Sequence, residues 1–221
     1  MRFPNALKGI KKIFTAEILM LICGLLGGIA GAFGQQASGQ IAEHGAEGIT
    51  AATAFGVMIP LLASGLIAII ASLIEFFGLK DASEDDEYFK KGYIYALIGL
   101  IVSIVIEILS FMKVGGTMVT DLGKVVSNFV QIVVTLYVIY GIRSLSEKLG
   151  ESAMAERGKK VFNVYAAAVI LASVVELGVA VLQGSAKTVV VGILGAVMLV
   201  LTIVGYFMYL RYLSAAKKML A

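Results

Sequence analysis

The chain has 221 residues, of which 59% are hydrophobic and only 15% are charged, and its mean hydropathy is +0.95. These values exclude an ordinary soluble domain and a disordered chain, because both carry more charge and less apolar surface. The single cysteine excludes an intramolecular disulfide framework. The net charge of +3 comes from Lys and Arg that sit beside apolar runs instead of forming a basic domain, so we expect no nucleic-acid partner.

Six apolar stretches are long enough to cross a bilayer, since a spanning helix needs about 20 mostly apolar residues. Segments of about ten residues with alternating hydrophobicity, which are typical of an outer-membrane barrel, are absent. The sequence therefore predicts an all-α integral membrane protein, with residues 1–221 forming a single six-helix transmembrane domain in contact with the lipid bilayer. The six stretches are approximately Ile13–Phe33, Phe55–Leu79, Gly92–Met112, Val125–Ile142, Val161–Gln183 and Thr188–Leu210.

The positions of Lys and Arg predict that both termini are cytoplasmic. Of the 18 Lys and Arg, all but Lys113, Lys124 and Lys187 fall in segments that share one side when both ends of the chain are inside. Cationic loops tend to stay in the cytoplasm. All nine tyrosines also fall in these segments or in the adjoining helix ends, where amphipathic rings favour the headgroup region. We therefore expect a multi-pass protein of the cell membrane, plasma or inner.

Three parts of the chain resemble one another and indicate hairpin repeats. A Lys-Lys pair at positions 11–12, 90–91 and 159–160 opens each odd-numbered helix. The sequence predicts three helical hairpins in parallel orientation, joined by short cytoplasmic links, with extra length in an outer loop from Gly34 to Ala54. The basic N-terminal segment and the apolar run after it also fit a cleavable signal peptide, but a helix that belongs to a repeat is expected to be retained. The predicted repeats cover approximately residues 8–83, 88–146 and 157–214.

Two glutamates inside the predicted spans are the main candidates for chemistry. Glu107 and Glu176 each lie 17 residues after the first lysine of their Lys-Lys pair, which predicts a similar depth in the outer half of the bilayer. A charged group at mid-depth costs about 2.5 to 3.5 kcal/mol on insertion scales, so an intramembrane carboxylate is a functional candidate by default. The polar residues expected near this depth are Ser103, Ser173, Asn128 and Gln131.

Carboxylates, amides and hydroxyls at one depth predict an oxygen-rich cavity that opens to the outside and binds a proton or a cationic solute. This interpretation favours a small transporter or channel subunit. Three parallel hairpins lack the inverted symmetry that is common in coupled transporters, which favours a channel or a simple carrier. The alternative interpretation is structural: each glutamate bonds to a neighbouring helix or is hydrated near the interface.

A ridge of glycines runs along the first predicted helix. Small residues at a spacing of four let helix backbones approach closely in lipid. The ridge predicts packing inside the bundle or, alternatively, an interface in a homo-oligomer or a larger membrane complex. The second class of function is therefore a non-catalytic scaffold or accessory subunit. The glycines are Gly24, Gly27, Gly28 and Gly31.

Signatures of enzymes are missing from the sequence. It contains no paired-histidine helix, no Gly-rich phosphate loop and no nucleophile elbow, and its one histidine excludes a His-rich zinc centre. We therefore expect no catalytic residues, no cofactor and no metal. The acidic run after Ser83 is predicted to cap a helix, with Ser83 and Asp86 as a capping box. Glu17 and Glu75 lie near the inner interface, where we expect them to be hydrated.

Overall fold

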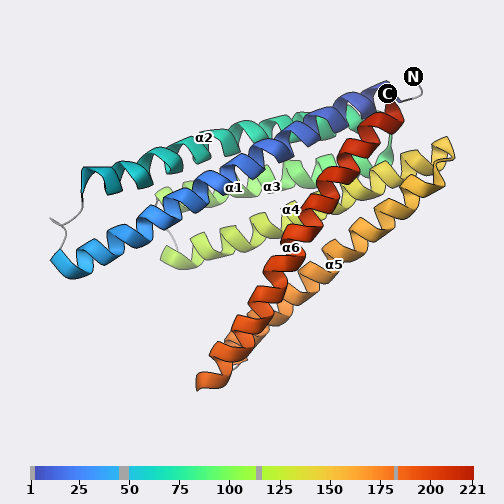
Figure 1. Cartoon of the computed structure of the whole chain (residues 1–221). Coiled ribbons are helices and arrows are strands. Elements are labelled where there is room, and N and C mark those ends of the chain that lie inside the picture. Colours follow the sequence, from blue (N-terminus) through green and yellow to red (C-terminus); the bar gives the residue numbers. More distant parts are fainter. Residues whose placement is uncertain (1–2, 45–49, 113–115, 182–183) are drawn as a thin grey trace. The chain divides into compact units, whose positions relative to one another are not determined.

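The computed structural model is all-helical and describes residues 3–44, 50–112, 116–181 and 184–221 (Figure 1). Within these residues, five helices are long and apolar enough to cross a membrane. The all-α class is confirmed, and the lengths fit a helical membrane protein. The predicted span Val161–Gln183 lies partly outside the described residues. The helices are α1 (Pro4–His44), α2 (Ala51–Ala82), α3 (Glu87–Phe111), α4 (Gly116–Leu149), α5 (Ser152–Val181) and α6 (Gly184–Leu220).

Helices α1 and α2 extend beyond the apolar stretches from which they were predicted. We expected an outer loop from Gly34 to Ala54, but α1 continues to His44 and α2 begins at Ala51, so this prediction was wrong. The segment after Gly34 contains Ala, Gln and Glu and no proline, and such residues continue a helix beyond the apolar stretch. The hydroxyl of Thr50 accepts a hydrogen bond from a first-turn backbone N–H of α2 at 3.2 Å, which caps this helix.

The chain divides into two units, which we describe separately. Unit 1 comprises Met1–Ile10 and Leu79–Ala221, and unit 2 comprises Lys11–Gly78. Within unit 1, α3 packs against α4, α4 against α5, and α5 against α6. Unit 2 contains most of α1 and α2.

The start of α1 and the end of α6 lie at the same end of unit 1 as the two short links between helices (Figure 1). We call this the inner end, and the opposite one the outer end. The links are residues 83–86, between α2 and α3, and residues 150–151, between α4 and α5. Gly150 has a φ of 79°, in the left-handed region that favours glycine, and it ends α4. The predicted short links are thus present, whereas their cytoplasmic location stays a prediction.

Asp86 joins α3 to α4 at the inner end. Its carboxylate accepts hydrogen bonds from the backbone N–H of Tyr88 at 2.9 Å and from the hydroxyl of Ser144 at 2.7 Å. It also accepts one from the ammonium of Lys148 at 2.6 Å. Asp86 is 5% exposed, so these donors replace the water that a buried carboxylate has lost. The first bond makes Asp86 the N-cap of α3.

Two other residues of the link 83–86 form hydrogen bonds to helix ends, one to α2 and one to α1. The hydroxyl of Ser83 donates to the carbonyl of Lys80 at 2.6 Å, at the end of α2. The carboxylate of Asp85 accepts the backbone N–H of Ala6, at the start of α1, at 2.7 Å. The predicted capping role of the acidic run is therefore confirmed, but the expected capping box of Ser83 and Asp86 was wrong. Each residue serves a different helix because α3 begins only at Glu87.

Glycines bring α3 and α4 close together. A Cβ added at Gly99 would lie 2.5 Å from Val130, and one added at Gly141 would lie 2.5 Å from the ring of Phe89. Phe89 is completely buried. Small residues therefore set the spacing of this pair, as is typical of membrane helices.

Large apolar side chains are exposed along the predicted spans. Soluble proteins rarely expose apolar patches of this extent, whereas lipid tails solvate them. The exposure therefore agrees with a membrane environment. Examples that are more than 60% exposed are Leu25 of α1, Leu66 of α2, Val125 of α4 and Ile193 of α6.

Candidate functional site

Glu107 lies on the face of α3 that is buried near the inner end. It follows Phe89 by 18 residues, which is about five helical turns, so the two side chains leave the helix in the same direction. Phe89 is completely buried, whereas Glu107 is exposed. The adjacent side chain of Ile106 lies against Gly123 of α4, so the two helices stay packed at this depth and Glu107 is exposed beside their contact.

On α4, Asn128 and Gln131 are exposed although they lie on the same side of the helix as buried residues. Asn128 precedes Ile139, and Gln131 precedes Ile142, by 11 residues each, or about three turns. Both isoleucines are buried, whereas both amides are exposed. The stripe of α4 that forms the core near the inner end thus becomes polar and open toward the outer end.

The described contacts that join α4 to α5 and α6 lie near the inner end. The rings of Tyr140 and Phe162 are 5.1 Å apart between centroids. The hydroxyl of Tyr212, in α6, donates to the carbonyl of Ile139 at 3.5 Å. Figure 1 shows α5 and α6 diverging from α3 and α4 with distance from this end. The divergence explains why the polar stripe of α4 is exposed.

Of the predicted polar residues, Ser103 lies at the contact between α3 and α4. The hydroxyls of Ser103 and Ser127 approach to 3.5 Å between α3 and α4. Close approaches at glycines set the antiparallel register of these helices. In this register Gln131 lies roughly 13 Å nearer the inner end than Glu107, at about 1.5 Å per residue. The predicted polar residues of α3 and α4 are therefore spread along the axis instead of sharing one depth.

Ser173 and Glu176 belong to α5, but their side chains lie outside the described residues. The predicted pairing of Glu176 with Glu107 stays a prediction.

Glu17, in unit 2, is a carboxylate whose burial was not expected from the sequence. We expected hydration, but Glu17 is 7% exposed, so this expectation was wrong. Glu75 is half-buried. The signal in the sequence is helical spacing: Glu17 follows Ile13 by four residues and shares its face, and Ile13 is completely buried.

The glycine ridge of α1 has no neighbouring helix within unit 2. A Cβ added at any of its glycines would meet no atom within 4 Å. Helices α1 and α2 meet at other residues, where the ring of Phe33 lies against Gly56 and the thiol of Cys23 donates to the carbonyl of Ser64 at 3.2 Å. The packing surface that we expected inside the bundle is therefore not found in the described part of this unit. The open glycines are Gly24, Gly27, Gly28 and Gly31.

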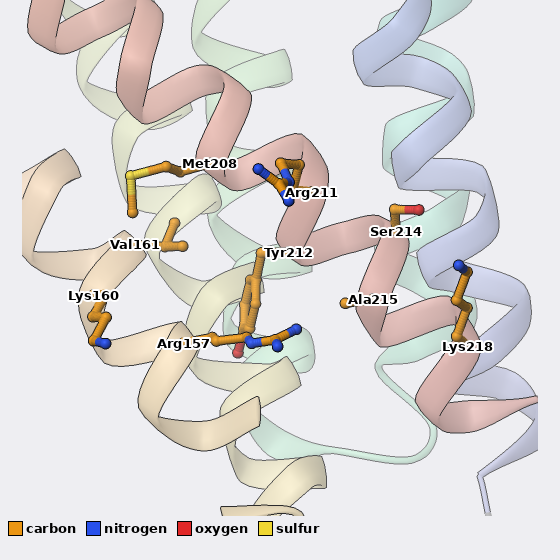
Figure 2. A pocket seen from close by; sticks show the side chains of 9 residues that line it. All are labelled: Arg157, Lys160, Val161, Met208, Arg211, Tyr212, Ser214, Ala215 and Lys218. Carbon is orange, nitrogen blue, oxygen red and sulfur yellow. The ribbon is translucent and has the colours of Figure 1, made fainter. Parts of the chain in front are cut away.

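A basic pocket of about 590 Å³ lies between α5 and α6 near the inner end (Figure 2). Arg157 and Lys160 line it from α5, and Arg211, Tyr212 and Lys218 line it from α6. In the sequence, these cations indicate only the orientation of the chain. That the four cations line one pocket depends on how α5 and α6 pair, which spacing along one helix does not reveal.

Comparison with protein-family models, curated proteins and solved structures found no match for this chain. Three features of the molecule bear on its function: the polar stripe near the outer end of unit 1, the open glycine ridge and the basic pocket.

Proposed function

We propose that this protein is a small multi-pass membrane transporter or channel subunit whose outer half binds a proton or a small cation. The supporting observation is that Glu107, Asn128 and Gln131 are exposed on helix faces that form the core near the inner end. In a membrane, a carboxylate and two amides avoid hydrocarbon only by bordering water or other polar groups. A water-filled entrance from the outer side meets this need for all three.

The spread of these residues along the axis bears on mechanism. A carboxylate and amide oxygens are ligands for hard cations, and a carboxylate also accepts a proton. The register separates Glu107 from Gln131, so the two act as successive positions on a path and not as one coordination shell. Successive weak sites suit conduction, because an ion must bind well enough to enter and weakly enough to leave.

Flux in proteoliposomes tests this function directly. The full chain is reconstituted, and proton and monovalent-cation flux are measured beside Glu107→Gln, which keeps the size of the side chain and removes its charge. We expect flux to fall by about tenfold or more. Glu151→Gln, in the exposed link between α4 and α5, is the matched control and keeps full flux. Unchanged flux in the Glu107→Gln, Glu176→Gln double variant overturns the proposal.

Glu17 provides a second arm of the same assay. If Glu17→Gln abolishes flux while Glu107→Gln retains it, the binding position belongs to unit 2 and the proposed outer-half site is wrong. If Glu17→Gln leaves flux unchanged in correctly folded protein, the outer-half site is supported. Size-exclusion profiles of each variant in detergent report the folding.

The open glycine ridge favours a second function, as a scaffold or accessory subunit that pairs through α1. A leucine at Gly28 would block close approach of another backbone, but it has open space around it in unit 2. Affinity capture from native membranes compares Gly28→Leu with Gly65→Leu, a matched control on α2 that also has open space. Loss of a partner only in Gly28→Leu supports the scaffold. Retention of every partner contradicts it.

A further inference from the structure

The basic pocket between α5 and α6 holds cations without acidic partners. Arg157, Lys160, Arg211 and Lys218 are all exposed, and none of them forms an ion pair within the described part of the chain. Four like charges around one space repel one another, and an anion in that space relieves the repulsion.

Other cations near the inner end differ in this respect. The ammonium of Lys148 is 2.6 Å from the carboxylate of Asp86. The guanidinium of Arg143 is 2.8 Å from the carboxylate of Glu147. Acidic residues are therefore available at this end, yet none of them lines the pocket. The pocket therefore differs from the rest of the inner end because no acidic side chain in its lining neutralises its cations.

The pocket has a fixed wall. Tyr212 is 3% exposed and lines the pocket beside Arg157 (Figure 2). Its hydroxyl donates to the carbonyl of Ile139, and Gly158 lies directly against it. Arg and Lys offer only hydrogen-bond donors, and the guanidinium fork matches phosphate geometry. The donor set therefore selects an anion, and a phosphate group suits it best.

An exposed apolar face leads along α6 to this pocket. Ile203, Phe207 and Arg211 are spaced by four residues and share one side of the helix. The first two are exposed and apolar, and the third lines the pocket. Val161 and Met208 supply apolar lining in the pocket itself. An apolar face that ends in a basic pocket matches a molecule with an acyl chain and an anionic head.

We propose that this pocket binds a phosphate group and that the group belongs to an anionic phospholipid, with its acyl chains along Ile203 and Phe207. Basic pockets between membrane helices at the cytoplasmic side are suited to such headgroups. A free phosphate would satisfy the same cations but would make no use of the apolar face. The site is separate from the polar stripe near the outer end and does not depend on the transport proposal.

Native mass spectrometry of the full chain tests lipid binding. Wild type is purified from nanodiscs of phosphatidylcholine mixed with phosphatidylglycerol, beside an Arg157→Gln, Arg211→Gln double variant. The control, Lys90→Gln with Lys91→Gln, removes the same charge near the inner end of α3, away from the pocket. We expect the pocket variant to retain phosphatidylglycerol about tenfold less than wild type, and the control to stay within about twofold of it.

Each outcome decides the proposal. Equal retention by the pocket variant and wild type, or an equal loss in the control, overturns the pocket as the binding site. Thermal unfolding with inorganic phosphate, against chloride at the same ionic strength, separates the two sources of phosphate. Stabilisation by inorganic phosphate without selective lipid retention overturns the assignment to a lipid. Ser214→Asp, which places a negative charge in the lining, provides a second variant and is expected to lower lipid retention as well.

Discussion

Tyr212 of α6 stands directly over Gly158 of α5, so close that a Cβ on Gly158 would overlap the tyrosine hydroxyl. The same hydroxyl donates to the carbonyl of Ile139 in α4 at 3.5 Å. One side chain thus joins three helices near the inner end and forms the wall of the basic pocket.

Gly158→Ala is expected to destabilise unit 1, because the added methyl group displaces the Tyr212 hydroxyl. Overpacking of this kind costs about 1 to 3 kcal/mol in the free energy of unfolding. Urea unfolding in detergent measures the change. Gly195→Ala, in α6, is the control: its Cβ has open space, so we expect equal or slightly higher stability. Equal stability of Gly158→Ala and wild type would show that α5 and α6 are not packed as described.

Gly141→Ala is expected to weaken the packing of α3 on α4 by a similar amount, about 1 to 3 kcal/mol, because its Cβ would lie 2.5 Å from the ring of Phe89. Phe89→Leu removes that ring. The two substitutions together should therefore cost less than the sum of the single ones, and a double-mutant cycle measures this coupling. Additive effects would contradict the contact.

Asp86→Ala is expected to lower the free energy of unfolding by about 2 to 4 kcal/mol, because it removes the N-cap of α3 and leaves the donors of Ser144 and Lys148 without their acceptor. Asp86→Asn keeps a capping oxygen and should lose roughly half as much. Glu84→Ala, at an exposed position of the same link, is expected to change stability by less than about 0.5 kcal/mol. Chemical unfolding compares the three, and a loss as large in Glu84→Ala would contradict the role of Asp86.

Cysteine labelling is expected to place the inner end in the cytoplasm. In a Cys23→Ser background, Ser38→Cys near the end of α1 and Glu151→Cys in the link between α4 and α5 are both exposed. A membrane-impermeant maleimide should label Ser38→Cys in intact cells and Glu151→Cys only after permeabilisation. The reverse pattern would overturn the predicted orientation.

Local features of the chain predicted much of the helical structure. Apolar stretches located the helices, and the acidic run before α3 indicated a cap. The identity of that cap was missed, because the capping residue depends on where α3 begins, which was uncertain by several residues. The outer ends of α1 and α2 were also missed, since the polar residues that follow the apolar stretch were taken for a loop although α1 continues through them to His44.

The candidate sites depended more on packing. Glu107 was found by its depth, but its exposure depends on which face α3 turns toward α4, the helix against which it packs. Glu17 looked hydrated by depth alone, yet its face of α1 is buried. The glycines of α1 looked suited to packing inside the bundle, and the structure leaves them open in unit 2.

The sequence by itself determined the all-α class and the number of helices, because lipid as a solvent requires long apolar runs whose backbone is satisfied within each helix. The tertiary structure alone decided which faces are covered and which cations converge. Those properties arise from contacts between segments far apart in the chain, such as Gly158 with Tyr212. Neither composition nor helical spacing specifies such contacts, because packing depends on the shapes of both surfaces at once.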